Sequence, residues 1–216
     1  FGTYNIQGMV NGLQWGMDNL VYVSGSLNPN EVSIPTKPTF KTVSLRSRGL
    51  RFHPDRLDQA ETISGGGQHG LGADDWQQWF TNTNSQHIRQ IVMPDHYLKK
   101  NPYFSVSTTL IDISDHGVAC KLFRISPFEA WRIERTKRRR EGADSSRFAA
   151  TELVPGGFTT SACSPTVYSA ALLPQEYYGT MLTCDPANNL IHRDRLLQDG
   201  PVLRSEEHTS ELQSRF

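Results

Sequence analysis

The sequence has no long apolar run, no excess of charge of one sign and no dense cysteine motif. No stretch approaches the roughly 18 consecutive apolar residues of a membrane-spanning helix, so we expect no transmembrane segment. Lys plus Arg and Asp plus Glu each total 22, a balance that argues against a nucleic-acid binder. Cys120, Cys163 and Cys184 are too far apart for a zinc or haem motif, and their disulfide state stays open.

Familiar catalytic motifs are also missing. The chain contains no HExxH, no Gly-x-Ser-x-Gly, no Cys-x-x-Cys-His and no EF-hand loop. The sequence therefore gives no support for metal-dependent hydrolysis, acyl transfer or haem attachment. We therefore assign no metal ligand from the sequence.

Both ends of the chain differ from those of a mature protein. Phe1 is not an initiator Met, and no signal-peptide pattern follows it, so we expect the native amino terminus to lie upstream. Residues 204–214 read RSEEHTSELQS, which looks like a translated sequencing adapter, and we expect 204–216 to be a non-native tail. A polar, frayed terminus is the alternative. Without the two arginines and three glutamates of this tail, the net charge is about +1.

Short strand patterns separated by Gly, Pro, Asn and Asp dominate the sequence, and helical periodicity is scarce. This pattern predicts an all-β fold, with short helices only near 95–99 and 127–132. The expected strands are 13–15, 20–24, 42–45, 50–52, 60–64, 79–83, 88–93, 120–125, 167–169, 179–183 and 190–195.

An imperfect repeat favours one all-β architecture. A turn rich in Asp or Asn beside apolar strands occurs at 15–22, at 72–80 and, more loosely, at 179–192. In each copy an Asp or Asn side chain can supply the local hydrogen bond of a tight turn. Repeated four-stranded units are typical of propellers, and we prefer a propeller to a sandwich.

The segment 95–157 is too long for an ordinary connection between strands. We expect it to combine a blade with an irregular surface insertion, inside a partial propeller domain that covers 1–203. Its basic run 135–140 is interpreted as a solvated loop, with binding to nucleic acid or an anionic surface as the weaker alternative.

Two polar segments are candidates for a binding or catalytic site. In 64–71, three successive glycines precede Gln68 and His69, so this segment is either a ligand-facing loop or a turn between blades. The segment 81–89 packs several polar side chains between apolar runs, where loops of a propeller can line a pocket. Its candidates for ligand binding are Asn82, Asn84 and Arg89, and His87 joins His69 as a candidate base; a structural role is the alternative for each histidine.

A third candidate group lies nearer the amino terminus. Asn11 directly precedes the first repeat, and we include it among the ligand-binding residues. Arg46 and Arg48 would suit an anionic cofactor, although charges that guard a strand edge explain them equally well.

Several motifs, in order along nearly all of 1–203, together resemble one family. They are MVNGLQWGMDN at 9–19, GLRFHPD at 49–55, GQHG at 67–70, DDW at 74–76, PDHYL at 94–98, NP at 101–102, FRISP at 123–127, TKRR at 136–139 and HRDRL at 192–196. The family is the propeller region of the large membrane-bound dehydrogenases, also called PVC-type haem-binding CxxCH proteins. That region is similar to soluble quinoprotein glucose and sorbosone dehydrogenases.

The resemblance implies an incomplete six-bladed β-propeller, located in the periplasm or otherwise outside the cytoplasm. It further implies oxidation of a sugar or related alcohol at pyrroloquinoline quinone (PQQ) with Ca²⁺, in a longer chain whose C-terminal domains include a c-type haem domain. A histidine base would remove the hydroxyl proton.

The sequence departs from that pattern at one important place. The base histidine of the soluble enzymes precedes a Gly-x-Asp turn, and the corresponding stretch 7–12 here contains no histidine. Two hypotheses follow: a quinoprotein-like dehydrogenase module, or a non-catalytic propeller that binds a glycan or a partner protein.

Overall fold

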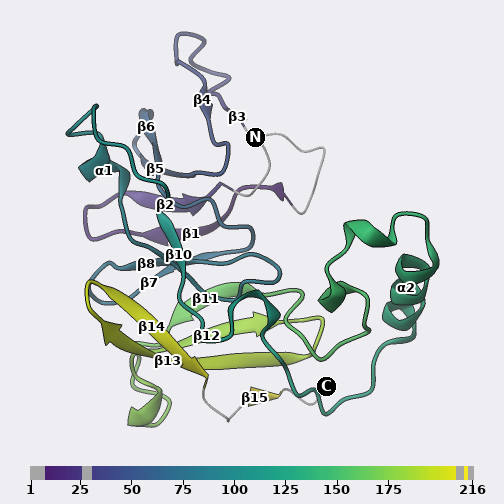
Figure 1. Ribbon diagram of the computed structural model, residues 1–216. Helices are drawn as coiled ribbons and strands as arrows, with labels where there is room; N and C mark the ends of the chain where they lie inside the picture. The colour runs from purple at the N-terminus through teal and green to yellow at the C-terminus, as the bar shows by residue number, and fades with distance from the viewer. Residues whose placement is uncertain (1–7, 26–30, 208–211, 214–216) are drawn as a thin grey trace.

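Three antiparallel sheets follow one another along the chain in the computed structural model, which describes residues 8–25, 31–207 and 212–213 (Figure 1). Sheet 1 consists of β1 (Asn11–Trp15), β2 (Val21–Ser24), β5 (Gly49–His53) and β6 (Arg56–Ile63). Sheet 2 consists of β7 (Leu71–Ala73), β8 (Trp79–Thr81), β9 (Arg89–Ile91) and β10 (Leu110–Asp112). Sheet 3 consists of β11 (Cys163–Val167), β12 (Thr180–Asp185), β13 (Leu190–Asp199) and β14 (Val202–Glu207), with β15 (Leu212–Gln213) paired to β13.

The strands of each sheet are hydrogen-bonded in their order along the chain, and every pairing is antiparallel. A separate hairpin, β3 (Glu31–Val32) and β4 (Val43–Ser44), is inserted between β2 and β5. The chain is therefore built mainly from β-structure in four-stranded antiparallel units, as the sequence predicts at this coarse level.

The first strands of the three sheets contact one another: β7 touches β1 on one side and β11 on the other. The backbones of these strands approach each other closely because glycines, which have no side chain, occupy the contact positions. A Cβ at Gly72 would lie 2.2 Å from the carbonyl oxygen of Pro165, and a Cβ at Gly12 would lie 2.7 Å from the nitrogen of Leu71. Without side chains at these positions, backbone packs directly against backbone.

Aspartate side chains form the turns that the repeat predicts. Leu20 donates its backbone N–H to Asp18 Oδ1 at 3.1 Å, and Trp76 donates to Asp74 Oδ1 at 3.0 Å. In the third copy Asn188 donates to Asp185 Oδ1 at 3.1 Å. The first two turns join the first and second strands of their sheets, whereas the third joins the second and third strands, which explains why that copy matches loosely.

Most of the predicted strands are present, and two predictions about the insertion are wrong. The segment 120–125 is not a strand; it holds only an isolated bridge, Lys121 to Phe158. The basic run 135–140 is not a loop but part of helix α2 (Ala130–Glu141), which extends well beyond the predicted turn at 127–132. Arg, Lys and Glu are good helix formers, and the ion pair between Glu134 and Arg138, four residues apart, supports the helix.

The other short helices agree with the sequence or lie in the insertion. Helix α1 (Asp95–Leu98) is present where a helical turn is predicted, in the connection between β9 and β10. The remaining helical turns are η2 (Gly117–Ala119), η3 (Ser145–Arg147), η4 (Ala150–Glu152) and η5 (Gln175–Tyr177). No helix in the described part of the chain has both the length and the apolar character needed to cross a membrane.

The segment predicted to be a non-native tail begins within an ordered strand. Residues 204–207 continue β14 beside β13, and Ser205 donates its backbone N–H to the Ile113 carbonyl at 2.8 Å. The last residues of the chain, apart from 212–213, lie outside the described ranges.

Sheets 2 and 3 share a hydrophobic core. Phe80 of β8 is fully buried in a cluster with Ile88, Ile113, Val167 and Met181. Because these side chains come from both sheets and from the connection between them, this core holds the two sheets face to face.

Replacing Phe80 by Ala should reduce the free energy of unfolding by about 3–5 kcal/mol, since it leaves a cavity in this shared core. Phe123→Ala is the matched control: Phe123 is 72 % exposed, and its replacement should change the stability by no more than about 0.5 kcal/mol. Urea denaturation followed by circular dichroism measures both values. Equal losses in the two variants would contradict the assignment of the core.

Candidate functional site

Two connections of sheet 2 meet at one end of that sheet. The segment 64–70 leads into β7, and 82–88 follows β8; because the two strands are antiparallel, both connections lie at the same end. The glycines of the first connection serve close packing. A Cβ at Gly66 would lie 2.2 Å from the Ser47 carbonyl carbon, and the Gly67 carbonyl accepts a hydrogen bond from Ser24 at 2.7 Å.

The polar residues that follow these glycines form a connected group. Gln68 accepts a hydrogen bond from the backbone N–H of Asn84 at 3.2 Å, and its own N–H donates to the Asn82 carbonyl at 2.7 Å. Asn11 donates from Nδ2 to the Gln68 carbonyl at 2.8 Å. The structure thus brings four of the predicted ligand-binding residues, and the neighbouring His69, to one place.

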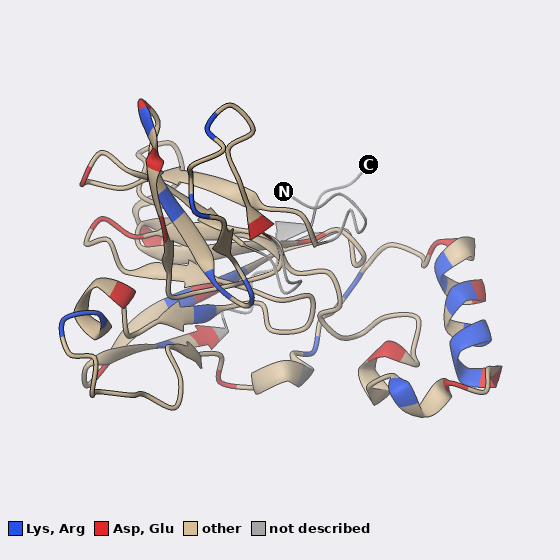
Figure 2. Cartoon of the chain, turned by 90° about the horizontal axis from the view of Figure 1, so that it is seen from above, with Lys and Arg blue, Asp and Glu red and all other residues tan. Residues whose placement is uncertain are grey.

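His69 and Asn84 line a cavity of about 470 Å³, and the insertion forms its opposite wall. Trp131, Arg132, Arg135 and Arg139 of α2 face this cavity. The arginines recur at spacings of three and four residues, which place them on one side of a helix. Figure 2 shows α2 beside the sheets, with Lys and Arg concentrated along it.

The arginines of α2 are held in different ways. Arg132 is buried and donates to the Pro155 carbonyl at 2.5 Å and to Thr160 Oγ1 at 2.7 Å. Arg139 forms an ion pair with Glu152. The Arg135 guanidinium lies 5.4 Å from the centre of the Trp131 ring. Burial lowers the pKa of both Arg132 and Arg135, as expected for cations that are partly removed from water.

His69 is half-buried at the edge of the cavity. Burial lowers the pKa of its imidazole, although a hydrogen bond with the Asn84 side chain opposes this effect in part. A lowered pKa keeps the ring neutral at neutral pH, and a neutral imidazole can accept a proton.

A network at the start of α2 fixes the helix to sheet 3. Arg124 forms an ion pair with Glu129 at 2.6 Å and donates to the Ala187 carbonyl at 3.0 Å. Asn189 donates to Glu129 at 3.1 Å. The hydrogen bond from Arg124 is the main cause that lowers the pKa of Glu129 to about 2.

Of the predicted site residues only His69 and Asn84 line this cavity; Asn11 and Gln68 lie behind them, and three others have different surroundings. Asn82 is fully buried, and its side-chain amide has no hydrogen-bond partner among the described residues. Arg89 is on β9, opposite Asp112 in the ladder with β10, and burial lowers its pKa. His87 is only 1 % exposed, so it does not reach an open pocket as a base would need to.

Instead, His87 packs against two other histidines and a carboxylate. Its ring lies 4.7 Å from that of His192 and 6.0 Å from that of His116, and its Nε2 is 3.3 Å from Asp194 Oδ1. Burial raises the pKa of Asp194, but the hydrogen bonds from His192 and His87 outweigh burial and hold that pKa well below its usual range.

The two arginines near the amino terminus, Arg46 and Arg48, do not line the cavity. Arg48 forms an ion pair with Asp95, which is buried and accepts a hydrogen bond from Ser64 at 2.7 Å. Arg46 is exposed. Arg48 therefore ties sheet 1 to α1.

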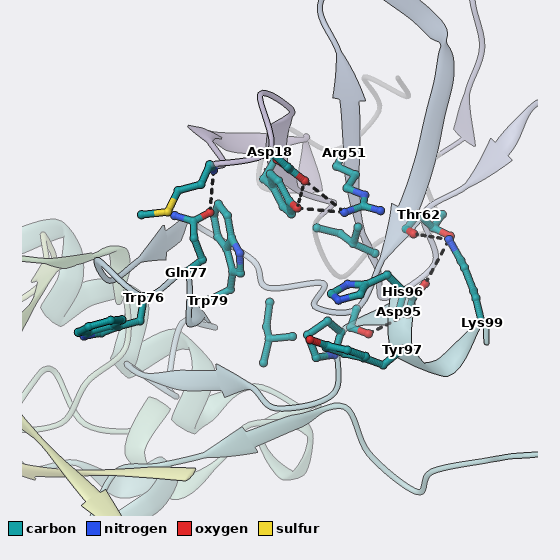
Figure 3. Close-up of a pocket in the computed structure, with 16 residues that line it drawn as sticks. Asp18, Arg51, Thr62, Trp76, Gln77, Trp79, Asp95, His96, Tyr97 and Lys99 are labelled. Atoms are coloured by element: carbon teal, nitrogen blue, oxygen red, sulfur yellow. Dashed lines mark hydrogen bonds and ion pairs between the residues drawn. The ribbon is translucent and has the colours of Figure 1, made fainter. Parts of the chain in front are cut away.

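A second pocket, of about 380 Å³, is lined by residues of sheet 1, sheet 2 and α1 (Figure 3). The turns around Asp18 and Gln77 contribute to it, and Met17 donates its N–H to Gln77 Oε1 at 3.1 Å. Tyr22 and Trp79 stack beside it with their ring centres 4.3 Å apart. Two strongly exposed aromatic residues also line this pocket, Trp76 (86 %) and Tyr97 (58 %).

The sequence did not identify the arginines of α2 or the aromatic pocket as site residues. The spacing of Arg132, Arg135 and Arg139 was a signal for one helical face, but the basic run was interpreted as a loop. Nothing local indicates that this helix lies over the end of the sheets, because its contacts there are with residues far away in the sequence.

Residues 1–216 match the model of a family that is described as a domain of unknown function (DUF7133). No curated protein and no solved structure matches the chain.

The pKa of Glu129 predicts a pH dependence of the attachment of α2. A carboxylate whose pKa falls from 4.5 to about 2 on folding stabilises the fold above pH 4.5, and this contribution is lost as the pH falls towards 2. In Glu129→Gln, the amides of α2 should exchange hydrogen faster than in the wild type at pH 6, and the difference should shrink at pH 3. Glu141→Gln, at the exposed last residue of α2, is the control; a difference that is independent of pH would contradict this origin.

Proposed function

The chain belongs to the DUF7133 family, and we propose that it is part of a quinoprotein-like dehydrogenase that oxidises a sugar or related alcohol in the cavity between His69 and α2. The observation that carries this proposal is the meeting of His69 and Asn84, both predicted from the sequence, with three arginines in a cavity of about 470 Å³. That volume lies within the range of sites for small molecules.

A propeller architecture is part of the proposal. Three successive four-stranded sheets whose first strands touch one another support it, because blades of a propeller are arranged in this way around their axis. The resemblance to membrane-bound dehydrogenases adds six blades, a location outside the cytoplasm and a c-type haem domain elsewhere in the longer protein.

The residues of the cavity fit one of the two cofactors that the resemblance implies. PQQ is an aromatic tricarboxylate; Arg135 offers a guanidinium group for a carboxylate and Trp131 offers a ring face, while Arg132 stays bonded to Thr160 and Arg139 stays paired with Glu152. When bound, the quinone supplies a two-electron oxidant. Ca²⁺ does not fit here, because the one carboxylate among the described lining residues, Glu152, is already paired with Arg139.

In this proposal the chain's own groups bind the substrate and accept its proton. His69, neutral at neutral pH, accepts the hydroxyl proton on a ring nitrogen, and Asn84 orients the ring through its hydrogen bond. Arg135, which stacks near Trp131, contributes positive charge that stabilises the developing alkoxide.

Reduction of a dye by the chain, with PQQ added and glucose as the first probe sugar, tests this function. His69→Gln should reduce the rate about 10²- to 10⁴-fold, the usual loss when a general base is removed, while leaving quinone binding intact. His53→Gln, at a histidine outside the cavity, should retain the full rate. A wild-type chain that binds no quinone, or equal rates in the two variants, would rule out the dehydrogenase.

The pocket of Figure 3 favours a second candidate function, the binding of a glycan without catalysis. Exposed Trp76 and Tyr97 lie on either side of the pocket, and Asp18, Arg51 and Lys99 supply charged hydrogen-bonding groups around it. Exposed aromatic rings beside polar groups suit ligands that have both apolar and hydroxylated faces. The absence of a histidine from 7–12 also agrees with a non-catalytic role.

Titration with neutral oligosaccharides of glucose, mannose and xylose tests the second candidate by calorimetry. Trp76→Ala should weaken binding about 5-fold, since a stacked aromatic contact contributes on the order of 1 kcal/mol. Trp131→Ala, which removes an exposed tryptophan from the other cavity, should leave the affinity unchanged. Loss of binding in Trp131→Ala alone would place the glycan beside α2 and not in this pocket.

A further inference from the structure

Three histidines and a cysteine converge between sheets 2 and 3. One ligand atom from each of His87, His116, Cys120 and His192 lies within 4.8 Å of the others. His87 comes from the connection between β8 and β9, and His192 lies on β13. His116 and Cys120 flank η2, in the connection that follows β10.

The cluster is shielded from water. Cys120 is fully buried, His87 is 1 % exposed and His192 is 2 % exposed, whereas His116 is half-buried. Placing several imidazoles and a thiol in a dry interior is costly unless their polar atoms have partners. His87 Nδ1 is buried and has no hydrogen-bond partner among the described residues.

Asp194 orients two of the rings. Its Oδ1 lies 3.3 Å from Nε2 of His87 and 3.3 Å from Nε2 of His192, and the carboxylate itself is completely buried. A hydrogen bond from Nε2–H to a carboxylate selects the tautomer that keeps a lone pair on Nδ1. This arrangement of carboxylate and histidine is usual around metal ions, where it raises the basicity of the ligand nitrogen.

Local geometry brings side chains of the cluster together in pairs, and the second pair includes the neighbouring carboxylate Asp194. His116 and Cys120 are four residues apart, and the single turn of η2 between them returns the chain so that both side chains reach the same point. His192 and Asp194 are two residues apart on β13, so both point to the same face of sheet 3. The turn therefore supplies His116 and the Cys120 thiol, and the strand supplies His192 together with the Asp194 carboxylate.

We propose that His87, His116, Cys120 and His192 bind one transition-metal ion, with Zn²⁺ as the best match, in a closed structural site. Three nitrogens and one thiolate complete the four-coordinate set that zinc prefers, and a site with four protein ligands has no position left for a substrate. Binding replaces the Cys120 thiol proton, which leaves to solvent, with a metal–sulfur bond. The ion links sheet 2, the insertion and sheet 3, and the site is independent of the cavity at His69.

Titration of the 216-residue chain with Zn²⁺ and Co²⁺ tests this site. Metal analysis after dialysis should give about one Zn²⁺ per chain. Co²⁺ should produce a thiolate-to-cobalt charge-transfer band together with the intense visible bands of tetrahedral coordination. The melting temperature should rise with Zn²⁺ concentration, because the ion binds the folded state only.

Variants separate this site from adventitious binding. Cys120→Ser should abolish the charge-transfer band, and Cys163→Ser, at a cysteine outside the cluster, should retain it. His116→Asn is the second variant, chosen because His116 is half-buried and its replacement disturbs the core least; it should lose tight Zn²⁺ binding and the thermal shift while its circular dichroism is unchanged.

Three outcomes would overturn the site: no tightly bound metal in the wild-type chain, a cobalt spectrum without the thiolate band, or a band that disappears in Cys163→Ser but persists in Cys120→Ser. Equal Zn²⁺ affinity in His116→Asn and the wild type would likewise contradict the ligand set. The dye-reduction assay of His69→Gln is unaffected by any of these results.

Discussion

The contact between the first strands of the three sheets is the constraint on which the rest of the structure depends. β7 lies between β1 and β11, and glycines at the contacts allow backbone to meet backbone at distances that no side chain would permit. The close packing of β7 against β1 and β11 determines the position of the connections at the ends of sheet 2. The group around Gln68 therefore lies next to Asn11 of sheet 1 on one side and next to the start of β11 on the other, where Ser164 donates its N–H to the His69 carbonyl at 2.7 Å.

The cavity at His69 and the pocket of Figure 3 are lined by different kinds of side chain. At one end of the sheets long connections and the insertion carry polar and cationic side chains, so the cavity there is lined by His69 and the arginines of α2. At the other end tight aspartate turns join the strands, and one of them places exposed Trp76 beside the pocket of Figure 3, which exposed Tyr97 of α1 also lines. A basic cavity suits a carboxylate-bearing ligand, whereas an aromatic pocket with hydroxyl partners suits a glycan.

The insertion has a structural role as well as a part in the cavity. Its first half brings His116 and Cys120 to the buried face of sheet 3, and Arg124 and Glu129 then fix the start of α2 to the turn between β12 and β13. The first attachment combines the metal-ligating groups with a small apolar cluster of Cys120, Leu122 and Leu190, and the second uses charged groups. A metal ion at the first attachment would hold this long connection more firmly than that apolar cluster alone.

The sequence by itself determined the all-β class, the position of most strands and the aspartate turns, because alternation and turn chemistry depend on residues close together in the chain. It also placed Gln68, His69 and Asn84 in one candidate site, since two adjacent connections of one sheet end together. Only the tertiary structure decided that α2 covers the cavity and that His87 joins His116, Cys120 and His192. Those ligands span more than a hundred positions, from 87 to 192, and no local pattern records which distant segments pack against each other. The same reason separated His87 from His69: both lie in connections at the same end of sheet 2, but burial against sheet 3 turned one into a structural group and left the other at an open cavity.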